Sequence, residues 1–275
     1  MLVKDIFDFL FSMQMDISIV TRALKTSELD WFFTNLKNIK NIDFEIIGVC
    51  SIEDSKIDNL GPSRIFIEKL NRFQARLFGI EKTSSENILL LDSDQTITQE
   101  LLEEIINSKT QMVIVPEKSL RKDIVGRMLD DFRAKLEERG RKSPLPTLPV
   151  IPRFYRKTSL LRGCENLSSD VLEFGVSHED SLLYYEVFKH TTSISFSKNY
   201  IFNNDPDLKT IIRKAFLYGK FGKDAFKSNK IPNEYLELID VLNRNSFGLR
   251  QMGLSKGDTV QFSRALAYFL GYLMG

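Results

Sequence analysis

The sequence predicts an α/β fold in which helices flank a mixed, mostly parallel sheet. Residues 16–22 and 44–50 are rich in β-branched side chains, and both segments predict strands. Apolar residues at helical spacing lie between them. A strand, a helix and a second strand within about 35 residues form a βαβ unit, whose strands pair in parallel. Residues 88–91 are four consecutive aliphatic side chains, typical of a strand buried on both faces.

The remaining elements follow from apolar spacing and from prolines. We expect helices over residues 3–13, 29–39, 70–80, 99–107, 121–141, 160–164 and 182–188, and short strands over residues 65–67, 112–115, 153–156 and 192–196. The strand over residues 153–156 is expected to direct its arginines outward. The proline-rich residues 142–152 cannot form a helix and predict a stiff connector.

The C-terminal part of the chain is predicted to be helical. We expect helices over residues 208–218, 235–242 and 259–275, so residues 1–205 would form one large domain and residues 206–275 an extension packed on it. The apolar residues 265–275 are too few to span a bilayer, which needs about 20. They predict either a core helix or part of a segment that docks on a membrane surface.

Composition and charge exclude several classes of protein. Of 275 residues, 43% are hydrophobic and 27% charged, and the formal charge of +1 gives no field that would attract nucleic acid. Two cysteines and two histidines are too few for a disulfide framework or a metal cluster rich in these residues. We recognise no secretory signal, so a cytoplasmic location is expected, with peripheral contact at the membrane face left open.

Two acidic residues end the strand over residues 88–91. In open α/β sheets, ligands bind beyond the carboxyl ends of the strands, which is where Asp92 and Asp94 lie. Carboxylate oxygens suit Mg²⁺ or Mn²⁺, and such ions complete their coordination with water and substrate phosphates. The alternative is a polar turn that leads into the helix over residues 99–107.

A second acidic pair, Glu179 and Asp180, opens the helix that contains residues 182–188. Negative charge at a helix N-terminus is stabilised by the helix dipole, so capping alone is one explanation of this pair. The other explanation is a role in chemistry together with Asp92 and Asp94.

The order of these features resembles that of the family-2 glycosyltransferases, which have the GT-A fold. Five segments between residues 16 and 222 carry the resemblance: the opening strand at residues 17–20, residues 74–80 (similar to A-R-N-x-G-I), residues 86–94 with the D-x-D motif, the acidic pair Glu179-Asp180, and residues 214–219 (similar to R/K-x-x-x-Y-G). The order and spacing of these segments are far more specific than any one of them.

The resemblance implies an inverting, metal-dependent transfer of a sugar from a UDP- or GDP-sugar to an acceptor hydroxyl on a glycan or a lipid-linked acceptor. Residues of about 16–116 would bind the nucleotide sugar and those of about 117–205 the acceptor. Asp94, with Asp92, would hold Mn²⁺ or Mg²⁺, which neutralises the charge on the leaving diphosphate. Asp180 would be the general base, and Glu179 would help to position the acceptor.

The resemblance also implies contacts with the donor, at Thr21, Arg22, Arg76, Asp92 and Ser93. A guanidinium suits a diphosphate, but Arg76 also fits a solvent-facing helix position, and Thr21 and Arg22 also fit a simple turn after the first strand.

The sequence departs from the family pattern in two places. The second strand ends in residues 50–55 without the usual D-D-G-S-type turn, which leaves Asp54, or Glu53, as the substitute acid. Residues 203–205 (Asn-Asn-Asp) stand where many members have a histidine.

Two other functions stay open at this stage. A nucleotidyltransferase would normally carry a glycine-rich phosphate loop after the first strand, and residues 21–26 contain no glycine. A non-catalytic module that binds nucleotide sugars would fit the displaced second-strand acid. The basic residues 121–142 predict either a flap over the donor or a solvated helix face. The oligomeric state is not indicated.

Overall fold

The structure is a computed structural model that describes residues 15–56, 62–247 and 256–274. The helix expected over residues 3–13 lies outside this range.

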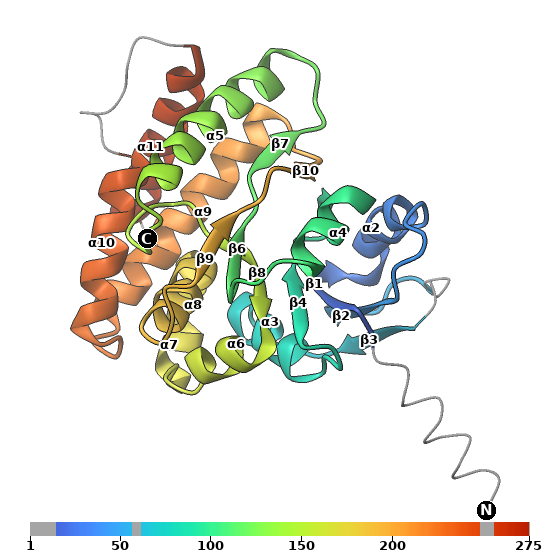
Figure 1. The fold of residues 1–275 in the computed structure, drawn as a ribbon. Coiled ribbons are helices and arrows are strands. Elements are labelled where there is room, and N and C mark those ends of the chain that lie inside the picture. The colour runs from blue at the N-terminus through green and yellow to red at the C-terminus, as the bar shows by residue number, and fades with distance from the viewer. Residues whose placement is uncertain (1–14, 57–61, 248–255, 275) are drawn as a thin grey trace, which may run out of the picture.

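A seven-stranded sheet forms the centre of the molecule (Figure 1). Its order is β3 (Ser63–Ile67), β2 (Phe44–Ile52), β1 (Ile17–Lys25), β4 (Asn87–Leu90), β8 (Pro152–Arg156), β6 (Met112–Ile114) and β9 (Ile194–Phe196). Only β8 runs against its neighbours β4 and β6, so six of the seven strands are parallel. The predicted α/β class with a mostly parallel sheet is confirmed.

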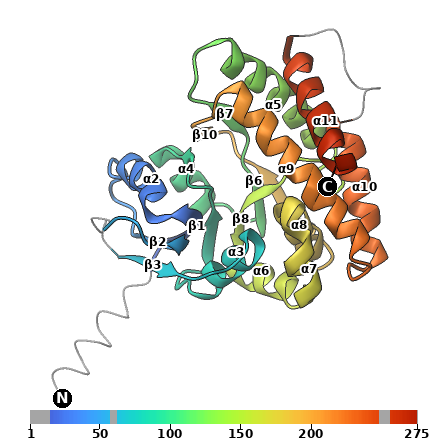
Figure 2. The ribbon, with the colours of Figure 1, turned by 180° about the vertical axis from the view of Figure 1, so that it is seen from behind.

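Helices cover both faces of this sheet. Helices α2 (Leu29–Leu36) and α4 (Gln99–Ile106) share one apolar core with alternate strand residues such as Ile19 and Leu89. On the other face, α3 (Arg72–Glu81), α6 (Lys157–Cys164), α7 (Ser169–Phe174) and α8 (Glu179–Phe188) pack against the intervening residues, among them Val20 (Figure 2). Short 3₁₀ helices, η1 (Thr26–Glu28) and η2 (Gly175–His178), precede α2 and α8.

A second, three-stranded sheet was not predicted. It joins β5 (Gln95–Thr96), β10 (Ile201–Asn203) and β7 (Glu117–Ser119) in the order β5-β10-β7. Gln95 links this sheet to the turn after β4. Its amide side chain accepts from the backbone N–H of Asp92 at 2.9 Å and donates to Asn203 Oδ1 at 2.9 Å. The sheet thus braces the turn that contains the D-x-D motif.

A layer of long helices lies beside the sheet: α5 (Ile124–Lys142), α9 (Leu208–Lys227), α10 (Asn233–Phe247) and α11 (Lys256–Met274) (Figure 1). Helices α9 and α11 meet backbone to backbone, since a Cβ added at Gly271 would lie 1.9 Å from the carbonyl oxygen of Phe216. Leu129 of α5 packs with Ile211 of α9 and Val260 of α11, so α5 joins this layer although it precedes residue 206. The boundary at residue 205 stays a prediction.

No helix within the described ranges is long and apolar enough to cross a membrane.

Candidate active site

The carboxyl end of β4 meets the N-terminus of α8 at two buried arginines. Arg76 Nη2 lies 3.1 Å from Asp92 Oδ1 and 3.3 Å from Asp180 Oδ1. Arg153 makes the same bridge from another side, with Nη1 3.3 Å from Asp180 Oδ2 and Nη2 3.7 Å from Asp92 Oδ2. Two carboxylates that are distant in the sequence therefore converge on one site.

Arg76 faces the interior rather than solvent. It lies on α3, its side chain is 1% exposed, and Nη1 donates to the carbonyl oxygen of Leu91 at 3.1 Å. The solvent-facing position that the sequence also allowed is excluded.

Arg153 was expected to point outward, and that expectation is wrong. Its side chain is 8% exposed, and Glu117 accepts hydrogen bonds from Nε at 3.2 Å and from Nη2 at 2.9 Å. Because β8 runs antiparallel to β4, the start of β8 lies at the edge where β4 ends. Alternation does not mark one face of β8 as the buried one, since Phe154 and Tyr155 lie on opposite faces and are both buried.

Glu179 is also buried and holds three guanidinium groups. Arg22 donates to its Oε1 in a short hydrogen bond, while Arg72 and Arg76 lie 3.5 and 3.7 Å away. Arg22 also lies 3.1 Å from Asp92, and Arg72 donates to the hydroxyl of Tyr218. Tyr218 belongs to the segment at residues 214–219, so this segment reaches the site, which the sequence analysis did not predict.

These side chains form what we call the arginine–carboxylate cluster. Its members are four guanidinium groups and four carboxylates: Arg22, Arg72, Arg76, Arg153, Asp92, Glu117, Glu179 and Asp180. The formal charges cancel, which is how buried ionic groups are normally tolerated.

The cluster keeps its aspartates ionised. Burial alone would raise the pKa of Asp92, but Arg22, Arg76 and Arg153 hold that pKa well below its ordinary value. Asp180 behaves in the same way: against the opposing effect of burial, Arg76 and Arg153 lower its pKa.

Several buried polar atoms of this region have no hydrogen-bond partner within the described residues. They are Thr21 Oγ1, Arg22 Nε, Arg72 Nε, Arg76 Nε and Glu179 Oε2. Such orphaned groups are rare in folded proteins and mark places where a ligand or water binds. Thr21 is fully buried and lies inside β1, which extends further than expected, to Lys25.

Asp94 stands apart from the cluster. It is half-buried, and its nearest cation is Lys214 Nζ of α9, at 3.8 Å. Burial, and then the charge of Asp92, raise the pKa of Asp94. A carboxylate in this position gains from a nearby cation. Ser93 lies beside it, also half-buried.

The residues around Asp94 fit a divalent ion that takes most of its ligands from water and substrate. No group of three or more histidine, cysteine or acidic side chains in the described part of the chain could hold a metal ion by itself. Mg²⁺ and Mn²⁺ do not need such a cage, because one or two carboxylates and a substrate phosphate suffice. Among the described residues, no arginine forms an ion pair with Asp94, whereas Asp92 is bound by three.

Asp54 serves a different contact. Its carboxylate accepts from the backbone N–H and the hydroxyl of Ser27, both at 2.9 Å, and the first of these is the main cause that lowers its pKa to about 2. It thereby ties the end of β2 to η1. No contact links Asp54 with the arginine–carboxylate cluster among the described residues.

A cavity of about 340 Å³ opens beside Asp94. Lys214 and Tyr218 of α9 line it, together with Tyr268 of α11. His178 also lines it; its Nε2 contacts Asn243 Oδ1 at 3.2 Å, and burial lowers the histidine pKa to about 4. The extension of the chain therefore supplies part of the site.

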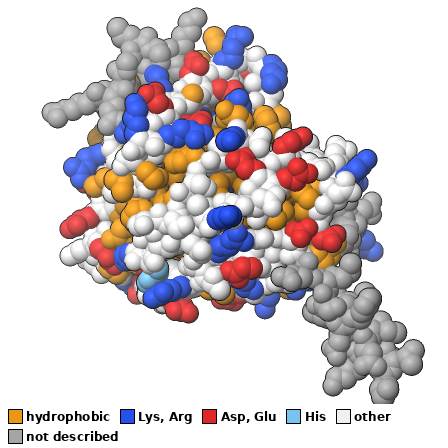
Figure 3. Space-filling view, viewed as in Figure 1, with side chains coloured by type: hydrophobic (Ala, Val, Ile, Leu, Met, Phe, Trp, Pro, Cys, Tyr) orange, Lys and Arg blue, Asp and Glu red, His pale blue; other side chains and the backbone are white. Residues whose placement is uncertain are grey.

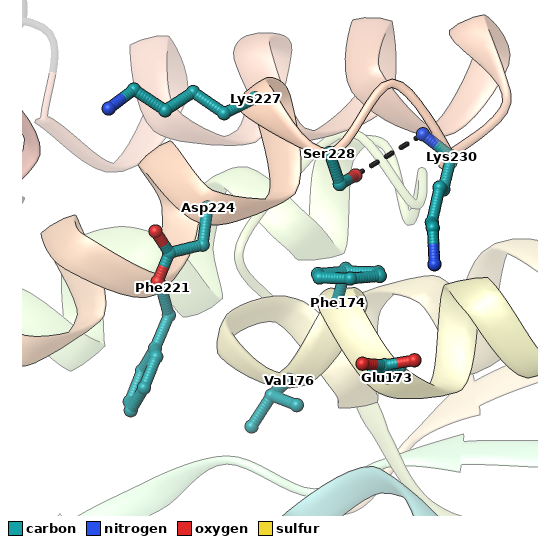
Figure 4. A pocket seen from close by; sticks show the side chains of 8 residues that line it. All are labelled: Glu173, Phe174, Val176, Phe221, Asp224, Lys227, Ser228 and Lys230. Carbon is teal, nitrogen blue, oxygen red and sulfur yellow. Dashed lines mark hydrogen bonds between the residues drawn. The ribbon is translucent and has the colours of Figure 1, made fainter.

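A second hollow, of about 450 Å³, lies further along α9 (Figure 4). Phe174 and Val176 come from α7 and η2, and Phe221, Asp224 and Lys227 from α9. Val176 directly precedes Ser177 and His178, which line the cavity beside Asp94.

Comparisons with known proteins support the fold. No protein-family model matches this sequence, and no curated protein matches it. Among solved structures, S. aureus TarS 1–349 in complex with UDP-GlcNAc matches with a TM-score of 0.52 at 15% identity, over 92% of this chain and 80% of that chain. The mannosyltransferase PcManGT from Pyrobaculum calidifontis, in complex with GDP-Man and Mn²⁺, matches with a TM-score of 0.54 at 13% identity, over 94% and 75%.

These neighbours are glycosyltransferases of the GT-A type. The seven-stranded sheet and its flanking helices are therefore the GT-A glycosyltransferase fold, as the sequence predicted. A longer S. aureus TarS chain also matches, with a TM-score of 0.53 at 13% identity, and this chain covers 47% of it.

Proposed function

We propose that this protein is an inverting glycosyltransferase that moves a sugar from a UDP- or GDP-linked donor to a hydroxyl of a glycan or a lipid-linked acceptor. The observation that carries the proposal is the convergence of Asp92 and Asp180 on the buried pair Arg76 and Arg153. The two acidic motifs of the resemblance thus occupy one site in a GT-A fold.

Asp180 is the group we assign as general base. Because Arg76 and Arg153 keep it ionised, it is ready to take a proton from an acceptor hydroxyl at neutral pH. Attack from the side opposite the leaving diphosphate inverts the anomeric configuration and needs no covalent intermediate. Glu179, fixed by Arg22 and Arg72, holds the start of α8 and so positions Asp180.

Arg22, Arg76 and Arg153 are the groups we assign to the diphosphate. In the structure they contact carboxylates, and the phosphate oxygens of a donor would compete for the same N–H donors. Ser93 and Thr21 are proposed to contact the nucleotide sugar, and Asp54 to shape the end of β2 that borders it.

The charge balance of the cluster supports a divalent cofactor. Four guanidinium groups already face four carboxylates, so a diphosphate adds negative charge that the cluster does not compensate. Asp94, together with Asp92, would hold Mn²⁺ or Mg²⁺. When bound, such an ion would supply electrostatic stabilisation of the leaving diphosphate.

Turnover of UDP- and GDP-sugars with and without Mn²⁺, measured as nucleotide release, tests the proposal. We expect release that needs the metal and falls by about 10²–10⁴-fold in Asp180→Asn, the usual loss when a general base is removed. Asp94→Ala is expected to abolish the metal response.

Asp131→Asn is the matched control, because Asp131 is exposed on α5. It should behave as the wild type. Full transfer by Asp180→Asn to a hydroxyl acceptor would exclude Asp180 as the base. Donor binding in calorimetry without turnover, over a full panel of sugars and acceptors, would indicate a non-catalytic module.

A further inference from the structure

Helix α11 exposes an apolar face. Its inner face packs against α5 and α9 through buried residues such as Val260 and Gly271. The opposite face carries five large apolar side chains at helical spacing, each between 43% and 56% exposed: Phe262, Leu266, Phe269, Leu270 and Leu273. A helix that is apolar all round is normally buried, and a contiguous exposed apolar face marks a binding surface.

Lysines of α9 adjoin this face. Helix α9 contains six basic residues and one acidic residue. Lys223 Nζ donates to the carbonyl oxygen of Leu273 at 3.0 Å, which places it at the C-terminal end of the apolar row. Lys220 and Lys227 lie near Lys223, and none of the three forms an ion pair with a carboxylate in the described ranges. Figure 3 shows that hydrophobic side chains also lie exposed among Lys and Arg side chains on the face of the molecule seen in Figure 1.

We propose that the apolar face of α11 and the lysines of α9 together bind an anionic phospholipid surface. Apolar side chains on one helix face enter the boundary between headgroups and acyl chains, while neighbouring lysines attract anionic headgroups. Self-association through this face would bring two lysine rows of like charge close together, so charge complementarity favours lipid over a second copy. Of the two sequence interpretations of the C-terminal segment, the core helix describes the inner face of α11, and the proposal assigns the exposed face to a membrane surface.

This surface lies on two helices that also line the cavity beside Asp94. The cavity beside Asp94 is lined by Lys214 and Tyr218 of α9 and by Tyr268 of α11, the same two helices that present the lipid-binding face. A docked protein would hold that cavity near the headgroups, where the hydroxyl of a lipid-linked acceptor lies. This consequence rests on the proposed function, whereas lipid binding itself does not.

Co-sedimentation of the full chain with vesicles tests the inference. One set contains phosphatidylcholine alone, and the other contains phosphatidylcholine with phosphatidylglycerol. We expect binding to the anionic vesicles that is at least about tenfold tighter than to neutral ones and that weakens at high salt. Phe269→Ser/Leu273→Ser should lose vesicle binding, and Lys220→Gln/Lys223→Gln/Lys227→Gln should lose the preference for phosphatidylglycerol.

Ile52→Ser/Ile67→Ser is the matched control, because these two side chains are similarly exposed at the ends of β2 and β3. It should bind vesicles as the wild type does. Thermal unfolding of each variant separates lost binding from lost folding.

Wild-type protein that stays in the supernatant with anionic vesicles overturns the proposal. So does a dimer that Phe269→Ser/Leu273→Ser converts to a monomer while vesicles bind neither form. Nucleotide release measured in parallel shows whether the proposed reaction fails independently.

Discussion

Arg153 shows how one residue can set the charge state of a site. Its guanidinium is fixed by Glu117 and reaches both Asp180 and Asp92, so it lowers the pKa of both carboxyl groups. Arg76 does the same from α3, but through the single atom Nη2, because its Nη1 donates to the carbonyl oxygen of Leu91. The candidate site therefore consists of the acidic motifs together with the buried arginines that contact them.

Removing Arg153 should move the acid side of the pH–rate profile. With both arginines present, the pKa of Asp180 lies below its ordinary value, so the base form persists as the pH falls. In Arg153→Gln one guanidinium is lost, and the pKa of Asp180 should rise. Activity should then begin to fall at a higher pH, which a profile of kcat against pH measures.

Arg127→Gln is the control for this change, because Arg127 is exposed on α5. A structural role for Arg153 would lower activity equally at every pH. If the acid limb lies at the same pH in Arg153→Gln and in the wild type, Arg153 does not affect the pKa of Asp180.

At the scale of elements, the close contact of α9 with α11 positions part of the site. Gly271 of α11 allows α9 to approach closely. On α9, Lys214 lies beside Asp94, and Tyr218 accepts a hydrogen bond from Arg72. The two helices cannot come this near with a side chain between them. Glycine is needed here for closeness rather than for an unusual backbone conformation.

Gly271→Ala should therefore destabilise the protein and reduce turnover together. The new Cβ would lie 1.9 Å from the backbone oxygen of Phe216, which cannot rotate away. Forced overpacking of this kind typically costs about 1–3 kcal/mol. Urea unfolding measures this loss of stability, with Lys227→Ala on the exposed side of α9 as the control. An unchanged urea midpoint would mean that α9 and α11 can move apart with no loss in the free energy of unfolding.

Most strands and helices were predictable, whereas the three strands of the small sheet were not. Consecutive aliphatic residues such as 88–91 and amphipathic runs such as 99–107 specify strands and helices through burial alone. Strands β5, β7 and β10 have two or three residues each, too few for any periodicity, and only tertiary contacts create them.

The residues of the candidate site also differ in how far the sequence alone could identify them. Asp92, Asp94, Glu179 and Asp180 could be singled out because they follow a buried strand or open a helix. Arg153 could not, because its position depends on the reversed direction of β8, which no local pattern encodes. Arg22 and Arg76 were singled out by resemblance, and the structure brings both to the carboxylates.

At the scale of the whole molecule, the charge balance predicts how ligands bind together. The arginine–carboxylate cluster is already neutral, and Asp94 alone offers few ligands to a metal ion. Mn²⁺ without donor, and donor without Mn²⁺, should each raise the melting temperature little. The two together should raise it clearly, since bound ligand stabilises by mass action, about 2.7 kcal/mol at a hundred times Kd.

Thermal-shift measurements over a panel of UDP- and GDP-sugars check this. The nucleotide diphosphates alone serve as controls for the sugar moiety. Equal shifts with and without Mn²⁺ for every donor would show that the arginines suffice to bind the diphosphate.

The small sheet has a consequence for anyone who wishes to divide this protein into pieces. Its three strands come from residues 95–96, 117–119 and 201–203, and β8 inserts between β4 and β6 in the large sheet. A cut near residue 116 would leave each fragment with unpaired strand edges and half of a buried ionic network. Fragment complementation, rather than independent folding of the two halves, is therefore the behaviour to expect from a split version.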